Sequence, residues 1–250
     1  MNNSDKSTRL DGRKSTDLRQ IKLTPHVSEF AEGSVLVEFG KTKVLCTASY
    51  DGPVPPWLKG SGQGWVTAEY GMLPRSTQTR IKRDKAANSG RSQEISRLIG
   101  RSLRAGVDLT KMGDKQITVD CDVLQADGGT RTAAVTGGFV ALALALKKLL
   151  DVSEIKSLAL THYVSAISVG LQNGNALLDL NYEEDSGIGT DMNFVMTDEG
   201  KFIEMQGTAE HEPFSKEDLS TMIDVAEHGC QSLFRLQSEI IGSFFPLKTK

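Results

Sequence analysis

The sequence lacks the cysteine and histidine patterns that mark disulfide-linked and zinc-binding proteins. Its three cysteines, Cys46, Cys121 and Cys230, lie far apart in 250 residues and form no Cys-x-x-Cys pair. The four histidines show no metal-ligand spacing. An odd number of isolated thiols is typical of a reducing compartment. We therefore expect a cytoplasmic protein without disulfides or a zinc centre.

Long hydrophobic runs are also absent. The longest run, Phe139–Leu146, is much shorter than the roughly 20 apolar residues that a membrane-spanning helix needs. It is expected to be a helix buried on nearly all sides. The first twenty residues are polar and charged, so no secretory signal is expected. These features predict a soluble protein that is not exported and has no membrane partner.

The net charge of −3 conceals an uneven distribution. Residues 75–104 hold nine Lys and Arg residues and only two acidic ones, whereas residues 179–218 hold twelve acidic residues and two lysines. A basic stretch in an otherwise acidic chain indicates a polyanionic partner, because the local potential attracts phosphate backbones.

The segment Asp120–Ala133 has the pattern of a strand, a glycine loop and the start of a helix. Apolar and polar residues alternate over 117–123, as in a half-buried strand. Gly128 and Gly129 would let backbone amides approach a ligand, and the helix N-terminus with Arg131 would favour an anion. The loop is neither a Walker loop nor Gly-x-Gly-x-x-Gly. It predicts a phosphate cradle, with an ordinary turn as the alternative.

The remaining patterns predict an α+β protein with helices packed on sheets. Strands are expected over 34–39, 42–50, 65–70, 164–171, 175–180, 193–197 and 201–206, and helices over 92–109 and from 215 past 233. Residues 74–91 are expected to form an exposed loop. The length allows one large domain or two modest ones, and a single unit covering 1–250 is expected, with a possible duplication of halves at about 10–150 and 151–245.

Three arginines follow one face of the predicted helix 92–109: Arg97, Arg101 and Arg104. The opposite face is apolar, so these side chains are expected to face solvent or another subunit. Arg91 differs, because it precedes the helix, where an anion would feel both its charge and the amide dipoles.

Asp185 and Asp191 flank a short segment with two glycines, which is expected to join strand ends and bring both carboxylates to one rim. Paired carboxylates near a phosphate site hold Mg²⁺ or supply a general acid. Asp179 and Glu184 fit this composition equally well. The alternative is that the aspartates only cap turns.

Four ordered motifs resemble the ribonuclease PH family of phosphate-dependent tRNA 3′-exonucleases. They cover residues 62–80, 120–133, 185–193 and 206–210, within a likeness that extends from Leu10-Asp-Gly-Arg13 to the last helix. The resemblance implies a ribonuclease PH-like α+β fold with a βαβα, ribosomal-protein-like core. It also implies a ring-shaped homohexamer, assembled as a trimer of dimers.

The resemblance further implies a role for each matching residue. The phosphate-binding positions are Arg91, Gly129, Thr130 and Arg131, and both arginines are expected to act in catalysis. Asp185 and Asp191 match the acidic pair associated with catalysis and a divalent metal, Mg²⁺ or Mn²⁺. The arginines that grip the tRNA acceptor stem match Arg75, Arg80 and Arg83.

The implied reaction is phosphorolysis of precursor tRNA and other RNA 3′ ends, including rRNA but not DNA. Inorganic phosphate, as co-substrate, attacks the last phosphodiester and a nucleoside diphosphate leaves; the reverse reaction adds nucleotides. Either aspartate, or water held by the metal, could protonate the leaving 3′-oxygen. The alternatives are a non-catalytic ring subunit of exosome type, a hydrolytic nuclease and a small-molecule phosphotransferase.

The chain departs from the family pattern in three places. It has Gly187-Ile188-Gly189 between the two aspartates, His211 where glycine is common, and a shorter, less basic loop at 84–90.

Overall fold

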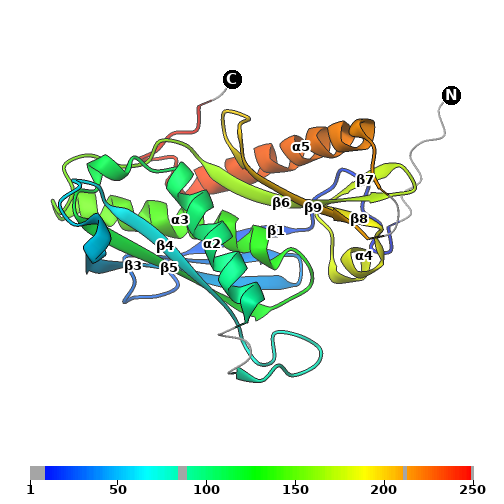
Figure 1. Cartoon of the computed structure of the whole chain (residues 1–250), viewed down its shortest axis with the longest axis horizontal. Helices are drawn as coiled ribbons and strands as arrows, with labels where there is room; N and C mark the ends of the chain where they lie inside the picture. Colours follow the sequence, from blue (N-terminus) through cyan, green and yellow to red (C-terminus); the bar gives the residue numbers. More distant parts are fainter. Residues whose placement is uncertain (1–8, 84–88, 211–212, 249–250) are drawn as a thin grey trace.

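The computed structural model describes residues 9–83, 89–210 and 213–248, which form two sheets with helices packed against them (Figure 1). The first sheet has the order β1 (Ile21–Pro25), β2 (Gly33–Phe39), β3 (Thr42–Pro53), β5 (Lys115–Gln125) and β4 (Trp65–Met72). Its neighbours are antiparallel except for β4 and β5, which are parallel. The second sheet is antiparallel, in the order β7 (Asn175–Leu178), β6 (Val164–Gln172), β8 (Thr190–Thr197) and β9 (Phe202–Ala209).

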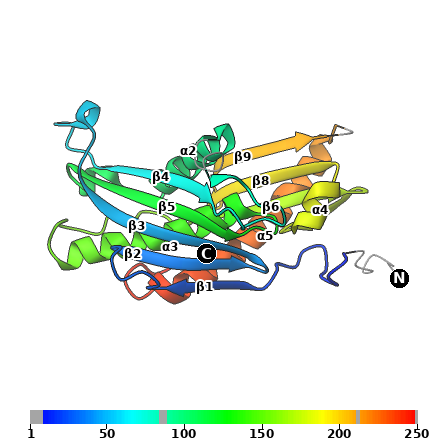
Figure 2. The ribbon, with the colours of Figure 1, turned by 90° about the horizontal axis from the view of Figure 1, so that it is seen from below.

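The helix α3 (Thr130–Asp151) lies at the centre of the molecule (Figures 1 and 2). It packs against β2 and β3 of the first sheet and also contacts β6 of the second. The approach is close at Gly137, where a Cβ would lie 2.6 Å from a methyl carbon of Val37. Although α3 is long and apolar enough to cross a membrane, 78% of its most apolar window is buried, as expected for a core helix.

The other long helices cover the two sheets. The helix α2 (Gly90–Ala105) packs on β4, and α5 (Lys216–Ile241) packs on β6 and β7. The predicted end of α2 at residue 109 was wrong. The helix ends at Ala105 with Gly106 as its C-cap, where the chain passes so close to the second sheet that a Cβ would lie 2.9 Å from a methyl carbon of Val164.

The second half of the chain contains a hairpin formed by the predicted strands β6 and β7, and one helix that was not predicted. The hairpin turns at Asn173 and Gly174, which have φ values of 50° and 74°. The short helix α4 (Tyr182–Gly187) follows β7, and β8 begins at Thr190, earlier than expected. Asp185 and Asp191 therefore flank a helix-to-strand connection, which corrects the expected junction between strand ends.

The two halves share a hairpin and a long final helix, but they differ in detail. The first sheet contains a parallel pair, whereas the second does not. One hydrophobic core extends from the first sheet through α3 to the second sheet and α5. A single catalytic unit with duplicated halves stays a prediction.

Candidate active site

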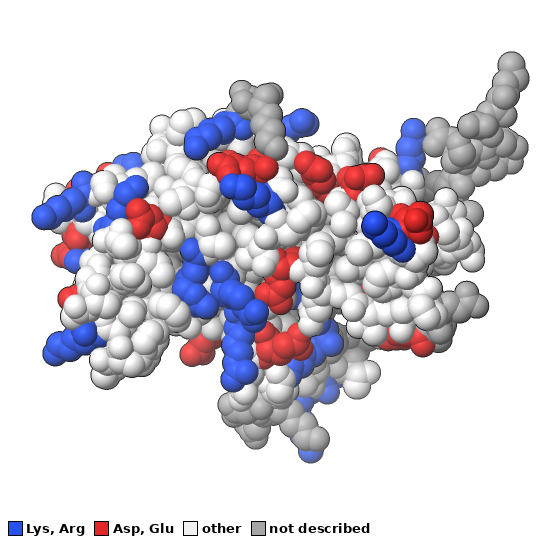
Figure 3. Space-filling model, turned by 45° about the horizontal axis from the view of Figure 1, so that its top comes forward, with Lys and Arg blue, Asp and Glu red and all other residues white. Residues whose placement is uncertain are grey.

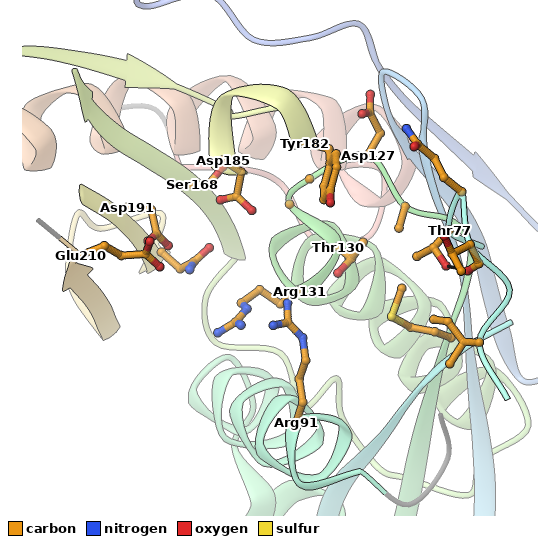
Figure 4. Close-up of a pocket in the computed structure, with 18 residues that line it drawn as sticks. Thr77, Arg91, Asp127, Thr130, Arg131, Ser168, Tyr182, Asp185, Asp191 and Glu210 are labelled. Atoms are coloured by element: carbon orange, nitrogen blue, oxygen red, sulfur yellow. Dashed lines mark hydrogen bonds between the residues drawn. The ribbon is translucent and has the colours of Figure 1, made fainter. Parts of the chain in front are cut away.

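A cavity of about 590 Å³ lies where the N-terminal ends of α2, α3 and α4 approach β8 (Figure 4). All residues predicted for phosphate binding or acidic catalysis line this cavity: Arg91, Gly129, Thr130, Arg131, Asp185 and Asp191. They come from separate elements, so the fold brings together groups that the motifs carry far apart in the sequence.

The side of the cavity where phosphate is predicted to bind, called the phosphate side below, consists of the loop 127–129 and the first turn of α3. Gly128 and Gly129 have φ values of 76° and 65°, in the left-handed region that favours glycine. Thr42 fixes the loop, because its hydroxyl donates to the Gly128 carbonyl at 2.7 Å and accepts from the Asp127 amide at 2.8 Å. The first amides of α3 have no acceptor within the helix, so this loop presents donors to an anion.

Two arginines extend into the cavity next to this helix start (Figure 4). Arg131 donates to the side-chain oxygen of Gln206 at 2.6 Å, and the Gln206 amide donates to Glu94 at 2.8 Å. Arg91 lies within the first turn of α2, not before it as predicted, because Ser89 caps the helix with its side chain. The two guanidinium groups lie side by side and face the acidic residues.

The Thr130 side chain is oriented by Tyr70, at 2.7 Å between the two hydroxyl oxygens. Burial raises the pKa of the Tyr70 phenol, although the Thr130 hydrogen bond and the nearby arginines oppose the shift. The phenol therefore stays neutral and keeps its proton for hydrogen bonding.

The opposite side of the cavity carries three carboxylates (Figure 4). Asp185 lies on α4, Asp191 on β8, and Glu210 just after β9. Burial raises the pKa of Asp185, and the charge of Asp191 raises it further. Burial also raises the pKa of Asp191; Arg131 lowers it and Glu210 raises it. These groups are close enough to repel one another.

The two alternative acids are occupied elsewhere. Asp179 is fully buried and accepts from the Arg19 side chain at 2.7 Å. Glu184 pairs with Arg9, also at 2.7 Å. Neither carboxylate lines the cavity. The structure thus favours Asp185 and Asp191 over the other pair that the composition allowed.

A divalent cation fits the chemistry of the acidic side. Within residues 9–83, 89–210 and 213–248, no three His, Cys, Asp or Glu side chains lie close enough together to hold a metal ion, so the protein would supply no more than two of the carboxylates on this side. Mg²⁺ prefers a few carboxylates completed by water and phosphate oxygens, which matches two carboxylates facing a phosphate cradle. Asp185 and Asp191 are the residues that would hold it.

The arginines predicted to bind tRNA lie outside the cavity. Arg75, Arg80 and Arg83 are exposed on the segment between β4 and α2, which projects from the body of the molecule (Figure 1). The same segment lines the cavity through 77–79 and 81. Basic and acidic side chains also gather side by side on one face of the molecule (Figure 3).

The predicted arginine face of α2 needs one correction. Arg104 is not solvated: its guanidinium lies 4.2 Å from the centre of the Trp65 ring and donates to the Val66 carbonyl at 2.8 Å. Arg101 lies 3.6 Å from Glu204 on β9, and Arg97 is exposed. The reason is that the N-terminal part of β4 runs beneath the end of this helix.

Several site residues were not singled out from the sequence. Tyr70 and Gln206 lie inside the quoted motifs, which was the available signal. Arg19, Thr42 and Glu94 lie outside them, and their partners are distant in sequence, so no local pattern marks them.

Of the three departures from the family pattern, the structure describes one fully. Ile188 is buried, and it forms a small apolar cluster with Leu177 and Leu180 that anchors the end of α4. His211 lies outside the described residues, as does most of the loop 84–90.

The chain matches a known family over most of its length. Residues 17–148 match domain 1 of the 3′ exoribonuclease family, and residues 162–229 match domain 2. The chain is 68% identical over 239 residues to the ribonuclease PH of Bdellovibrio bacteriovorus, covering 96% of this chain and 98% of that protein. The chain therefore belongs to the 3′ exoribonuclease family of ribonuclease PH, and the predicted family is confirmed.

Solved structures with lower sequence identity share the fold. The crystal structure of rice (Oryza sativa) Rrp46 has a TM-score of 0.71 at 22% identity, covering 94% of this chain and 99% of that one. The Archaeoglobus fulgidus exosome with RNA bound to the active site has a TM-score of 0.77 at 22% identity, covering 91% of each chain. The predicted fold, with mixed sheets packed with helices, is confirmed.

Proposed function

We propose that this protein is a phosphorolytic 3′-to-5′ exoribonuclease, a tRNA nucleotidyltransferase that trims precursor tRNA. An oxygen of inorganic phosphate attacks the phosphorus of the last phosphodiester. The bond from that phosphorus to the 3′-oxygen of the preceding nucleotide breaks. A nucleoside diphosphate leaves, and the shortened RNA takes up a proton on its new 3′-hydroxyl. Because an anhydride forms as an ester breaks, the reaction also runs in reverse.

One observation carries this proposal: two guanidinium groups and the α3 N-terminus face a pair of aspartates across a single cavity. Phosphorolysis must hold two negatively charged phosphorus centres together, which requires preorganised donors. Arg91, Thr130, Arg131 and the amides after Gly129 would bind the attacking phosphate. Gln206 keeps Arg131 in place before substrate arrives.

On the acidic side, Asp185 and Asp191 would hold Mg²⁺ or Mn²⁺, which neutralises charge on the scissile phosphate when bound. Burial raises the pKa of both side chains, so either can retain a proton more readily than an exposed aspartate. A carboxyl group of this kind is suited to protonate the departing 3′-oxygen.

The cavity also offers apolar and aromatic surface that could contact a nucleoside. Met72, Ile81 and Tyr182 are among the residues that line it. Tyr182 is 55% exposed and offers a flat ring on which a base can stack without selecting its identity. The exposed arginines at 75, 80 and 83 would bind the RNA backbone outside the cavity.

The proposal includes a homohexameric ring that acts in the cytoplasm on tRNA precursors and other RNA 3′ ends, rRNA included. The family resemblance supports the ring, and light scattering tests it: a mass six times that of the chain is expected. A monomeric mass at the assay concentration contradicts this part of the proposal alone.

The deciding experiment incubates a 3′-extended tRNA transcript with and without inorganic phosphate and identifies the released mononucleotide. We expect trimming only with phosphate, and nucleoside diphosphates as products. A hydrolytic nuclease would work without phosphate and release monophosphates. A non-catalytic ring subunit would bind the RNA and leave its length unchanged.

A further inference from the structure

The helix α4 carries Asp185, yet it has little packing of its own. It spans six residues, and none of them is buried. A helix this short is unstable in isolation and usually depends on a buried face. The apolar contacts of this region come from residues on either side of the helix, in the small cluster that contains Ile188. An interaction in addition to this cluster must therefore hold the helix itself in place.

That interaction is an ion pair with the N-terminal segment. Arg9 donates from Nε and Nη2 to the two carboxylate oxygens of Glu184, each at 2.7 Å. Arg13 also donates to Glu184, at 3.3 Å. The side chains are almost inaccessible, with 1% exposure for Arg9 and 9% for Glu184. A bidentate pair of this kind fixes orientation as well as distance.

The same two arginines also hold the chain immediately before α4. Arg9 Nη1 donates to the Leu178 carbonyl at 2.8 Å, and Arg13 Nη1 donates to the Asp179 carbonyl at 2.9 Å. Glu184 in turn accepts from the amide of Asn181 at 3.0 Å, which completes the capping box of α4. One carboxylate thus stabilises the helix start and attaches it to the N-terminal segment.

Charge in this cluster is maintained despite burial. Burial alone would raise the pKa of Glu184, but the hydrogen bonds from Arg9 and from the Asn181 amide, with the charges of Arg9 and Arg13, lower it overall. Glu184 therefore stays ionised at neutral pH, and the pair keeps its full strength.

A third arginine connects the same segment to the opposite side of the cavity. Arg19 pairs with buried Asp179 at 2.7 Å and donates from Nη1 to the Asp127 carbonyl at 2.6 Å. Asp127 belongs to the loop that forms the phosphate cradle. The segment 9–19 therefore touches both sides of the cavity while it lines neither.

We propose that residues 9–19 are a positioning element for the active site, in which Arg9 and Arg13, through Glu184, hold Asp185 at its working distance from the phosphate cradle. This inference deepens the proposed function and rests on it. A misplacement of about 1 Å at a reacting group reduces turnover about 100-fold. The positioning residues are therefore expected to affect turnover more than phosphate binding, since Arg91 and Arg131 are attached elsewhere.

The test uses the full-length protein and compares Glu184→Gln with Glu183→Gln. Glutamine at 184 can still cap α4, but it removes the charge that Arg9 requires. Glu183 is exposed on the same helix and lines no part of the cavity. We expect kcat to fall at least about tenfold in Glu184→Gln, with KM for phosphate within about twofold of the wild type. Glu183→Gln is expected to keep the wild-type values.

Arg9→Lys provides a second variant that retains the charge and removes the two-pronged geometry. Its kcat is also expected to fall. In an Asp185→Asn background, Glu184→Gln should cause no further decrease of residual kcat, because both changes then act on the same group. Independent, multiplying decreases would overturn the proposal, as would a wild-type kcat in Glu184→Gln.

Amide hydrogen exchange tests the positioning without reference to activity. Exchange over residues 182–187 is expected to accelerate in Glu184→Gln and Arg9→Lys and to be unchanged in Glu183→Gln. Unchanged exchange in all three variants contradicts the proposal. A wild-type protein that trims RNA without phosphate would contradict the proposed function instead, and the exchange result would still decide whether Glu184 holds α4.

Discussion

The two sides of the cavity are held by different forces. The phosphate side begins α3, which has sixteen buried residues and packs into the hydrophobic core. The acidic side includes α4, which has none and is attached through the Arg9–Glu184 ion pair. The hydrophobic effect is non-directional, so packing of α3 does not depend on any single contact. A bidentate ion pair requires a specific geometry, and the removal of either partner leaves the other charge buried and unpaired. We therefore expect the phosphate side to be robust and the acidic side to be adjustable.

The largest effect is expected from removing an arginine on the phosphate side. Arg131→Ala removes one of the two charged donors to phosphate, which costs about 2–5 kcal/mol, or roughly 30-fold to several thousand-fold in kcat/KM. Arg91→Ala is expected to act similarly, and both variants should keep the wild-type oligomeric mass. Steady-state kinetics at varied phosphate provides the measurement. Arg97→Ala, an exposed arginine on α2, is the control, and equal rates in all three variants would exclude these arginines from the site.

A substitution at Gly128 is expected to damage the junction between the two sides. Alanine there has a positive φ, and its Cβ would lie 2.6 Å from the Leu180 carbonyl just before α4. Gly174→Ala is the matched control, because its φ is also positive but nothing lies within 4 Å. Backbone strain alone costs about 1–2 kcal/mol. Gly128→Ala should therefore lower Tm further than Gly174→Ala and should alone reduce activity; equal decreases would show that only strain matters.

A smaller effect is expected on the acidic side, where removal of a buried charge should increase stability and decrease activity. Burial raises the pKa of Asp191, so its ionisation disfavours the folded state. The stability that the protonated Asp191 contributes is fully present at pH values below the pKa of aspartate in the unfolded chain. It is lost as the pH rises through the higher pKa that Asp191 has in the folded protein. Asp191→Asn should raise Tm at pH 7 and reduce trimming, and the gain in Tm should vanish as pH falls below about 4. A lower Tm at pH 7 would contradict this description.

The smallest effect is expected outside the cavity, at the exposed loop. Arg80→Ala should weaken RNA binding and reduce the slope of log K against log salt by about one unit for each phosphate that the protein no longer neutralises. Arg235→Ala, an exposed arginine on α5, is the control. RNA binding titrations at several salt concentrations provide the slopes. A slope equal to that of the wild type would remove Arg80 from the interface.

Much of the phosphate side could be predicted because its signals are local. The alternation in β5, the two glycines and the apolar helix after Ala133 are adjacent in sequence, and each has a direct physical meaning. The acidic side was harder, since α4 has almost no helical pattern and its attachment depends on hydrogen bonds between residues 175 positions apart. The boundary of α2 was missed for the same reason, because Gly106 is required by a neighbouring sheet and not by the helix itself.

The sequence by itself determined the family, the buried central helix and the charged residues of the site. These features could be recognised because hydrophobic periodicity and glycine turns are patterns of only a few neighbouring residues. The tertiary structure alone decided which of four nearby acids remain available in the cavity. Asp179 and Glu184 are each paired with an arginine from the N-terminal segment, whereas Asp185 and Asp191 face the arginines of the phosphate side. Such a choice depends on distances between elements far apart in the chain, which no local pattern encodes.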